Sequence, residues 1–304
     1  MIFGAGGLLG RALARELESR GGPFLALDRA AADVTDPVRV AEAVRSFAPE
    51  VVYNCAAFTR VDDCETRSEL AHEVNGRAVV HLAAAARADG AALVQVSTDY
   101  VFDGTARAPY REEAPAAPLQ EYGRSKLLGE QVALGWERSV VVRTSWLFGP
   151  HGPSFVSTML RSFAGAAPVR VVDDQVGCPT YTPFLARALV DLAASGARGV
   201  VHYRNRDAVS WHGFAVEIAR RAAPGREVAP VSTAEFYGAP RPGSAPERSP
   251  ASPTAAASPE SARPARRPAY SVLDVERFEA IAGRRVEAWS DGLDQCLLEL
   301  AAAR

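Results

Sequence analysis

A tyrosine and a lysine four residues apart carry the clearest chemical signal in this sequence. Tyr122 and Lys126 begin a segment whose pattern is typical of a helix, on which residues at this spacing share one face. A lysine cation near a phenol favours the phenolate, so we expect the pKa of Tyr122 to fall from about 10 toward the working range of a proton donor. The same spacing also arises by chance on amphipathic helices, so the pair alone does not decide the function.

A second group of polar side chains follows a short apolar run. Residues 93–96 suit a buried parallel strand, and Ser97, Thr98 and Asp99 come directly after it. In open α/β sheets, ligands bind at the carboxyl ends of such strands. We expect Thr98 to hold a substrate carbonyl oxygen against Tyr122, while a reduced nicotinamide supplies hydride from the other side.

A glycine-rich turn near the amino terminus predicts the dinucleotide site that this chemistry needs. Gly4, Gly7 and Gly10 follow the apolar residues 1–3 and precede a segment of helical periodicity. This order gives a tight turn, a close approach of the backbone to a pyrophosphate, and a helix amino terminus facing the anion. The first strand would be very short, so either the start is a few residues late, which we favour, or the sheet tolerates a short strand at its centre.

The nicotinamide cofactor can be NADH or NADPH. A second strand at residues 24–27 ends in Asp28, whose carboxylate can bind the ribose hydroxyls of NADH. The neighbouring Arg29 could instead accept the 2′-phosphate of NADPH. The sequence leaves this choice open.

Composition agrees with a cytoplasmic enzyme. The chain has 304 residues, of which 48% are hydrophobic, enough for one large α/β domain or one with a smaller annex. A net charge of −2 gives no electrostatic reason to expect nucleic acid or an anionic membrane as a partner. The sequence has no signal-peptide pattern and no long apolar run, and its four cysteines form no C-x-x-C pair, so we expect neither a zinc site nor disulfides.

Three local predictions concern elements around the site. Thr35 or Asp36 is expected to cap a helix that begins near Pro37, and Ser210 to cap a later one. The small residues Ala56 and Ala57 end a strand where a flat cofactor can lie close, although ordinary tight packing explains them equally well. Asn75 is either a surface residue or a hydrogen-bond partner of a loop near the cofactor.

Several longer motifs extend these signals over nearly the whole chain. They are the glycine turn at 4–10, Asn54-Cys55-Ala56-Ala57-Phe58-Thr59-x-Val61-Asp62, the run from Ser97 to Gly104, Tyr122-Gly123-x-Ser125-Lys126, Arg143-Thr144-Ser145-Trp146, Asp174-Gln175-x-Gly177-x-Pro179-Thr180-Tyr181 and Arg267-Pro268-x-Tyr270-Ser271-Val272-Leu273-Asp274. Together they resemble the dTDP-4-dehydrorhamnose reductase family of extended short-chain dehydrogenase/reductases.

The resemblance implies a fold and a reaction. The fold would be a Rossmann-type doubly wound parallel sheet at 1–149 that binds NAD(P), followed by a smaller, mainly substrate-binding α/β region at 150–304. The reaction would be hydride transfer from NADPH or NADH to C4 of dTDP-4-dehydro-6-deoxy-L-mannose, which gives dTDP-L-rhamnose after Tyr122 protonates the alkoxide.

The resemblance also implies roles for single residues. Tyr122, Lys126 and Thr98 would be catalytic, and Thr98, Asp99 and Trp146 would contact the sugar. The cofactor would meet Gly7, Leu8 and Leu9 at its diphosphate, Asp33 and Val34 at its adenine, Ala57, Phe58 and Thr59 at its middle, and Tyr122 and Lys126 at its nicotinamide ribose, with Gly4, Gly10, Asp28, Arg29, Ala56 and Ser97 completing the cofactor set.

Position 100 separates this sequence from related nucleotide-sugar 4,6-dehydratases. Those enzymes resemble this scaffold but carry an Asp-Glu acid/base pair after the threonine, because they also remove water. Here Tyr100 follows Asp99. A phenol is a poor substitute for that carboxylate, so simple ketone reduction is favoured over dehydration.

Two features depart from the family pattern. Residues 238–268 form a Pro/Ala/Ser-rich segment with little hydrophobic content, which we expect to be a disordered insertion. Some family members are described with magnesium bridging carboxylates between subunits, but Arg11 stands at one such place here, so no metal site is assigned. A homodimer is the candidate assembly.

Two other functions stay open from the sequence. One is a reductase for a different dTDP-4-keto-6-deoxy sugar. The other is a non-catalytic, nucleotide-binding regulatory subunit, although such a protein has no need of the proton donor that Tyr122 provides.

Overall fold

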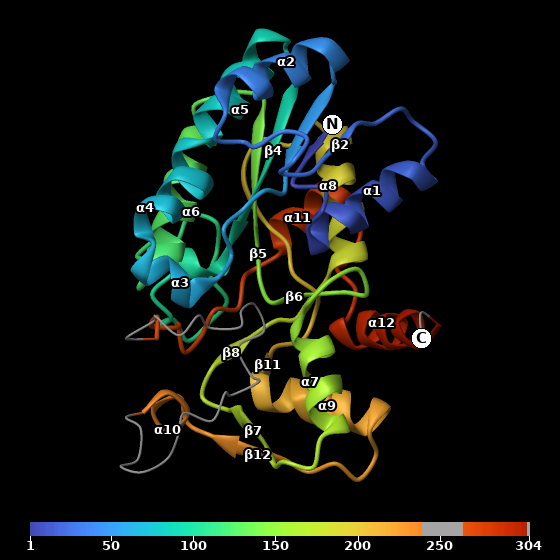
Figure 1. Cartoon of the computed structure of the whole chain (residues 1–304). Coiled ribbons are helices and arrows are strands. Elements are labelled where there is room, and N and C mark those ends of the chain that lie inside the picture. The colour runs from blue at the N-terminus through green and yellow to red at the C-terminus, as the bar shows by residue number, and fades with distance from the viewer. Residues whose placement is uncertain (239–263, 303–304) are drawn as a thin grey trace.

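The computed structural model of the chain describes residues 1–238 and 264–302. Figure 1 shows an upper part in which helices flank a sheet, and a lower part in which α7 (Phe155–Ala164) and α9 (Trp211–Ala222) lie beside short strands. Within the described ranges, no helix has the length and apolar character needed to cross a bilayer.

A parallel sheet of six strands forms the upper part. Its order is β10-β5-β4-β3-β1-β2, so the chain runs outward from β1 in both directions. The strands are β1 (Ile2–Phe3), β2 (Ala26–Leu27), β3 (Val51–Asn54), β4 (Ala92–Thr98), β5 (Ser139–Thr144) and β10 (Gly199–His202). The order reverses at β1 and β3, where doubly wound sheets open a crevice for ligands. The predicted α/β fold is confirmed, although β2 is shorter than the expected run at 24–27.

Helices cover both faces of this sheet (Figure 1). One face packs against α1 (Leu8–Ser19), α8 (Thr182–Ala194) and α11 (Glu276–Ala282). The other carries α2 (Pro37–Phe47), α5 (Val79–Ala88) and α6 (Glu121–Leu134), with α3 (Val61–Thr66), α4 (Ser68–His72) and the π-helical turn η1 (Glu73–Arg77) beside α6. Side chains of β4 alternate between the two cores, because Val94 faces one and Leu93 the other. This two-sided burial explains the continuous apolar run in the sequence.

Among the described residues, three short two-stranded sheets and four further helices build the lower part. The pairs are β6 (Leu147–Phe148) with β9 (Thr180–Tyr181), β7 (Val169–Val172) with β12 (Val228–Val231), and β8 (Val176–Gly177) with β11 (Val209–Ser210). Besides α7 and α9, the helices are α10 (Thr233–Tyr237) and α12 (Trp289–Ala302). After residue 149, β10 completes the upper sheet and α8 covers one of its faces, so the two regions share that sheet across the predicted boundary.

The predicted helix starts are made by side-chain caps. Asp36 Oδ1 accepts hydrogen bonds from the backbone N–H groups of Val38 and Arg39 at 3.0 and 3.1 Å. Ser210 Oγ accepts from Gly213 N at 3.0 Å at the start of α9. Both predicted caps are confirmed, with Asp36 chosen over Thr35.

Most of the predicted insertion at 238–268 lies outside the described residues. At its carboxyl end the chain is packed again, because Ala265 is 5% exposed and the Arg267 side chain 6%. The buried part of the chain therefore resumes before residue 268, where the composition alone had placed the boundary.

Candidate active site

The turn between β1 and α1 brings the backbone close to the end of β3. Gly4 has φ +77°, and a Cβ there would lie 2.5 Å from the backbone nitrogen of Ala56. A Cβ on Gly10 would overlap the carbonyl oxygen of Gly4. Gly7 caps α1 without a side chain, which leaves the first helical turn open to an anion. The turn therefore fits a dinucleotide diphosphate.

Two cavities meet at this turn. One of 390 Å³ extends from the glycines past β2, and one of 420 Å³ extends past the ends of β4 and β5. Both are lined by Gly7, Cys55, Ala56 and Ala57. Together they form an elongated site, as a dinucleotide and a second ligand would require.

The smaller cavity contains the residues predicted for the adenosine end. It is lined by Asp28, Arg29, Asp33 and Val34, and also by Phe58, which was predicted for the middle of the cofactor. Arg29 pairs with Asp33 at 3.0 Å, and its side chain is 82% exposed. A carboxylate and a guanidinium thus both border this cavity.

The loop between the two cavities is held by Asn75. This residue is 1% exposed, and its side-chain oxygen accepts from Phe58 N at 2.7 Å. Its amide nitrogen donates to Phe58 O at 3.0 Å and to Ser125 Oγ at 2.9 Å. Asn75 is therefore a partner of the cofactor loop, as one of the two interpretations predicted.

The larger cavity brings the predicted catalytic side chains together. Tyr122 and Lys126 come from α6, and Thr98 from the end of β4. Lys126 is 3% exposed and donates from Nζ to Val96 O at 2.6 Å, and burial lowers its pKa to about 8. Both α6 residues face one cavity, as the four-residue spacing predicted.

The predicted lowering of the Tyr122 pKa by Lys126 is wrong in this structure. Burial raises the pKa of Tyr122, and the nearby Cys64 and Asp99 raise it further, whereas the Thr98 hydroxyl lowers it. The Lys126 ammonium group is directed to the backbone of β4 instead. Desolvation of the phenolate on burial is the largest contribution to this shift.

Asp99 has an unusual carboxyl group at the same end of β4. It is 2% exposed, and its Oδ1 accepts from Thr98 Oγ1 at 3.1 Å. Its Oδ2 has no hydrogen-bond partner among the described residues. Burial raises the pKa of Asp99 to about 7, so both protonation states are present at neutral pH.

Ser97 connects the site to a buried ion pair. Its Oγ donates to Glu130 Oε1 at 2.5 Å, and Glu130 binds Arg143 through Nη2 at 2.7 Å. Both charged side chains are at most 6% exposed. Ser97 lines the larger cavity, but its hydroxyl proton is used in the hydrogen bond to Glu130, which does not line that cavity.

Comparison with known proteins identifies the group to which this chain belongs. Residues 1–302 match the family model described as the RmlD substrate binding domain. The chain is a member of this family. A dTDP-4-dehydrorhamnose reductase from Streptomyces griseus is 39% identical over 304 residues, which cover 97% of this chain and 91% of that protein. The resemblance predicted from the motifs is confirmed.

Two further relatives share most of the chain. A dTDP-4-keto-6-deoxy-D-glucose reductase from Streptomyces niveus is 40% identical, covering 78% of this chain and 84% of that protein. The crystal structure of a dTDP-4-dehydrorhamnose reductase from Bacillus anthracis in complex with NADP has a TM-score of 0.86 and 33% identity, with 98% of both chains covered.

In this RmlD-family chain, all but one of the predicted site residues line one of the two cavities. Gly10 is the exception, because it packs beneath the glycine turn. The larger cavity holds Gly7, Leu8, Leu9, Ala56, Ala57, Thr59, Ser97, Thr98, Asp99, Tyr122, Lys126 and Trp146, and the smaller one adds Gly4, Asp28, Arg29, Asp33, Val34 and Phe58. Among residues 1–238 and 264–302 no cluster of three metal-ligating side chains is present.

The larger cavity is also lined by residues that the sequence did not single out for the site. Among them are Gln175, Trp211, Tyr237 and Arg267. Arg267 binds both carboxylate oxygens of Asp62, at 3.0 and 2.8 Å, and lies 4.8 Å from the ring centre of Tyr237. Gln175 and Arg267 stand in motifs that the sequence displays, but nothing in those motifs says that they face the cavity.

Proposed function

We propose that this chain reduces the C4 ketone of dTDP-4-dehydro-6-deoxy-L-mannose with NADPH or NADH and forms dTDP-L-rhamnose. The observation that carries this proposal is the convergence of Tyr122, Lys126 and Thr98 on a cavity that adjoins the glycine turn. The curated activity of the Streptomyces griseus relative and the NADP in the Bacillus anthracis structure support it.

Each side chain has a distinct task. A bound NADPH or NADH supplies hydride to the ketone carbon. Thr98 orients the ketone oxygen, and Tyr122 donates its proton to the alkoxide that forms there. Lys126 would hold the nicotinamide ribose, and the Thr98 hydroxyl, which lowers the pKa of Tyr122, stabilises the phenolate once the proton has left.

Tyr100 supports reduction rather than dehydration. Its ring lies edge-to-face with Tyr122, with centroids 6.1 Å apart, and it lines the same cavity. Burial raises the pKa of Tyr100, so it stays a neutral phenol at physiological pH. A neutral phenol cannot act as the base that removal of water requires.

The direct test follows the absorbance of reduced nicotinamide when the purified chain meets enzymatically prepared dTDP-4-dehydro-6-deoxy-L-mannose. NADPH and NADH are compared, and the product is identified by its sugar stereochemistry. Oxidation of cofactor with formation of dTDP-L-rhamnose supports the proposal. Tight cofactor binding without turnover would refute it and would favour a regulatory, nucleotide-binding role.

A second candidate is a reductase for another dTDP-4-keto-6-deoxy sugar. The Streptomyces niveus relative, whose name specifies the D-glucose form, is 40% identical over 78% of this chain, against 39% over 97% for the Streptomyces griseus one. Running the same assay with dTDP-4-keto-6-deoxy-D-glucose separates the two by their ratio of kcat/KM. A cytoplasmic location, a homodimer and the absence of nucleic-acid or membrane partners stay predictions.

A further inference from the structure

Trp146 has a backbone conformation that few residues with a side chain adopt. Its φ is +45°, in the left-handed region. Hydrogen bonds fix the chain on both sides: Ser145 Oγ donates to Cys178 O at 2.7 Å, and Thr180 N donates to Trp146 O at 3.1 Å. Such strain persists only where surrounding structure enforces it, and it is concentrated at functional sites.

The indole ring of Trp146 is held on both faces. Trp211 stacks on one face, with ring centroids 3.5 Å apart and an angle of 6° between the planes. A Cβ on Gly177 would lie 2.5 to 2.7 Å from three indole atoms, namely Cε2, Cζ2 and Nε1. Since Trp211 already covers one face, Gly177 must lie against the other.

The two sides of this clamp are tied to each other. Gly177 in β8 pairs with Val209 in β11, and Trp211 follows β11 as the first residue of α9. Trp211 is 8% exposed and also packs on Phe155, with centroids 4.7 Å apart. The spacing between Gly177 and Trp211 is therefore fixed by a strand pair and a helix start.

The clamped ring forms part of the wall around the reaction centre. Trp146 lines the same cavity as Thr98 and Tyr122. A rigid ring at this place limits how the substrate sugar can lie between them. The orientation of the sugar decides which face of C4 receives hydride, and with it the stereochemistry of the product.

We propose that Trp211 and Gly177 are positioning residues, which clamp Trp146 against the sugar and so set the face of the C4 ketone that is reduced. This inference rests on the proposed reductase function. It makes the clamp a determinant of specificity, while the proton donor and the cofactor site stay unchanged.

The test compares Trp211→Leu, which removes the stacked ring, with Trp211→Phe, which keeps an aromatic face. Trp136→Phe is the matched control, because Trp136 bonds to Ala91 O and does not line the cavity. Stacked tryptophans give an exciton couplet in circular dichroism, which should disappear in Trp211→Leu and persist in Trp136→Phe. The affinity for NADPH should stay near the wild-type value in all three variants.

The kinetic readout separates positioning from general damage. Loss of an aromatic pair should lower kcat/KM for the keto sugar about tenfold in Trp211→Leu, with partial recovery in Trp211→Phe. Trp211→Leu should also release some of the C4 epimer of the rhamnosyl product. In a Trp146→Leu background the further effect of Trp211→Leu should vanish, because Trp211 acts through Trp146.

Different failures are distinguishable. An active wild type whose Trp211→Leu variant keeps kcat/KM and makes a single epimer overturns the clamp alone. A wild type that oxidises cofactor with neither keto sugar overturns the proposed function, and the clamp inference with it. If Trp211→Leu does not fold, Gly177→Ala provides the same test, because its new methyl group would push the Trp146 indole aside. A Gly177→Ala variant that still makes a single epimer also refutes the inference.

Discussion

Replacing Asp99 with asparagine should become more favourable for stability, relative to the wild type, as the pH rises from acidic to alkaline. The carboxyl group is 2% exposed, and burial raises its pKa from 3.8 to about 7. The folded state therefore keeps a proton that the unfolded chain releases. Asparagine has nearly the same shape and can still accept the hydrogen bond from Thr98, but it does not ionise.

The size of the effect follows from the two pKa values. Because the pKa of Asp99 is higher in the folded state, the free energy of unfolding falls as the pH rises through the window from about 4 to about 7. A difference of about 3 pKa units, at about 1.36 kcal/mol each, amounts to about 4 kcal/mol at full ionisation. At about pH 5 the wild type has already lost roughly 1.5 kcal/mol of its free energy of unfolding. The free energy of unfolding of Asp99→Asn, relative to that of the wild type, should therefore rise by about 3 kcal/mol between about pH 5 and about pH 8.5.

Urea unfolding of both proteins at the two pH values measures this change. Asp103→Asn is the matched control, since hydrogen bonds from Thr105 and Tyr110 hold the pKa of Asp103 below 3.8, outside the window. Its difference from the wild type should be the same at both pH values. If the difference between Asp99→Asn and the wild type also stays the same at both pH values, the pKa of Asp99 is not raised by folding. That result would refute the reasoning.

Three further perturbations test other parts of the structure. Tyr122→Phe should lower turnover about 10²-fold and leave the cofactor dissociation constant unchanged, as measured by steady-state kinetics and fluorescence titration; full activity would remove Tyr122 as proton donor. Arg267→Met should cost about 3 kcal/mol in urea unfolding, because it leaves the Asp62 carboxylate, 7% exposed, without its charged partner and with, among the described residues, only the Ala265 backbone N–H as a donor; adding Asp62→Asn should recover part of that loss in a double-mutant cycle. Gly10→Ala should lower stability by about 1–3 kcal/mol, whereas Gly7→Ala, whose Cβ would lie 3.4 Å from Gly4 O, should unfold thermally near the wild type.

Local patterns in the sequence were enough to predict the sheet and its ligand-binding edge. The apolar run before Ser97 predicted β4, and its side chains are buried on both faces. The glycines at 4 and 10 predicted the tight turn, whose backbone leaves no room for a Cβ. Both predictions depend on neighbours within a few residues, which a single sequence displays directly.

The clamp around Trp146 could not be predicted in this way. Gly177 and Trp211 are separated from Trp146 by 31 and 65 positions in the sequence. Neither has a local signal for its contact, because a glycine beside a strand and a tryptophan at a helix start have many roles. Only the pairing of β8 with β11 places them on opposite faces of one ring.

The sign of the Tyr122 pKa shift was mispredicted for a related reason. Helical spacing fixes that Lys126 is near Tyr122, but the pKa depends on the whole shell of groups around the phenol. That shell buries the hydroxyl and contains the acidic groups of Cys64 and Asp99. Sequence spacing shows one interaction at a time, whereas desolvation sums over groups from distant segments.

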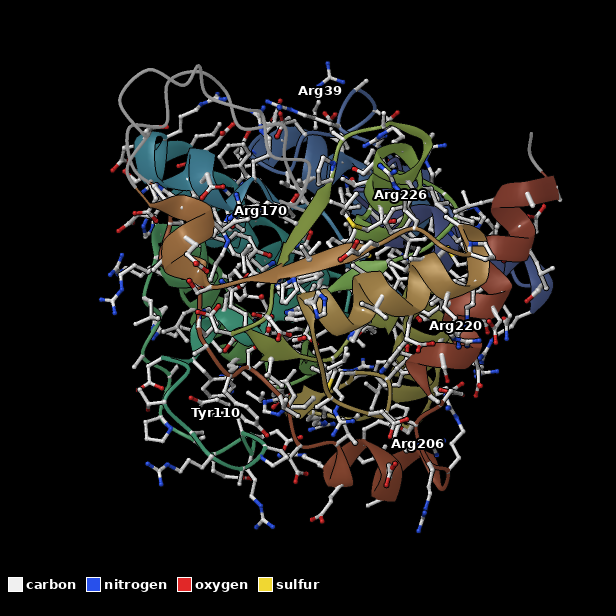
Figure 2. The ribbon with its side chains drawn as sticks, turned by 90° about the horizontal axis from the view of Figure 1, so that it is seen from below. Arg39, Tyr110, Arg170, Arg206, Arg220 and Arg226 are labelled. Carbon is white, nitrogen blue, oxygen red and sulfur yellow. The ribbon has the colours of Figure 1, made fainter. Side chains whose placement is uncertain are left out.

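The late segment around Arg267 to Asp274 connects the walls of the site to one another (Figure 1). Arg267 binds Asp62 beside the cofactor loop, and the backbone of Ser271 donates to Val176 O at 2.9 Å in the lower part. Tyr110 forms two backbone hydrogen bonds with this segment, and in one of them its carbonyl oxygen accepts from Asp274 N at 2.7 Å. Figure 2 shows that Tyr110 lies away from Arg170 and Arg226 of the lower part. These bonds join both parts of the molecule, and Arg267 from this segment lines the larger cavity. The wall of that cavity is therefore complete only when this segment is in place.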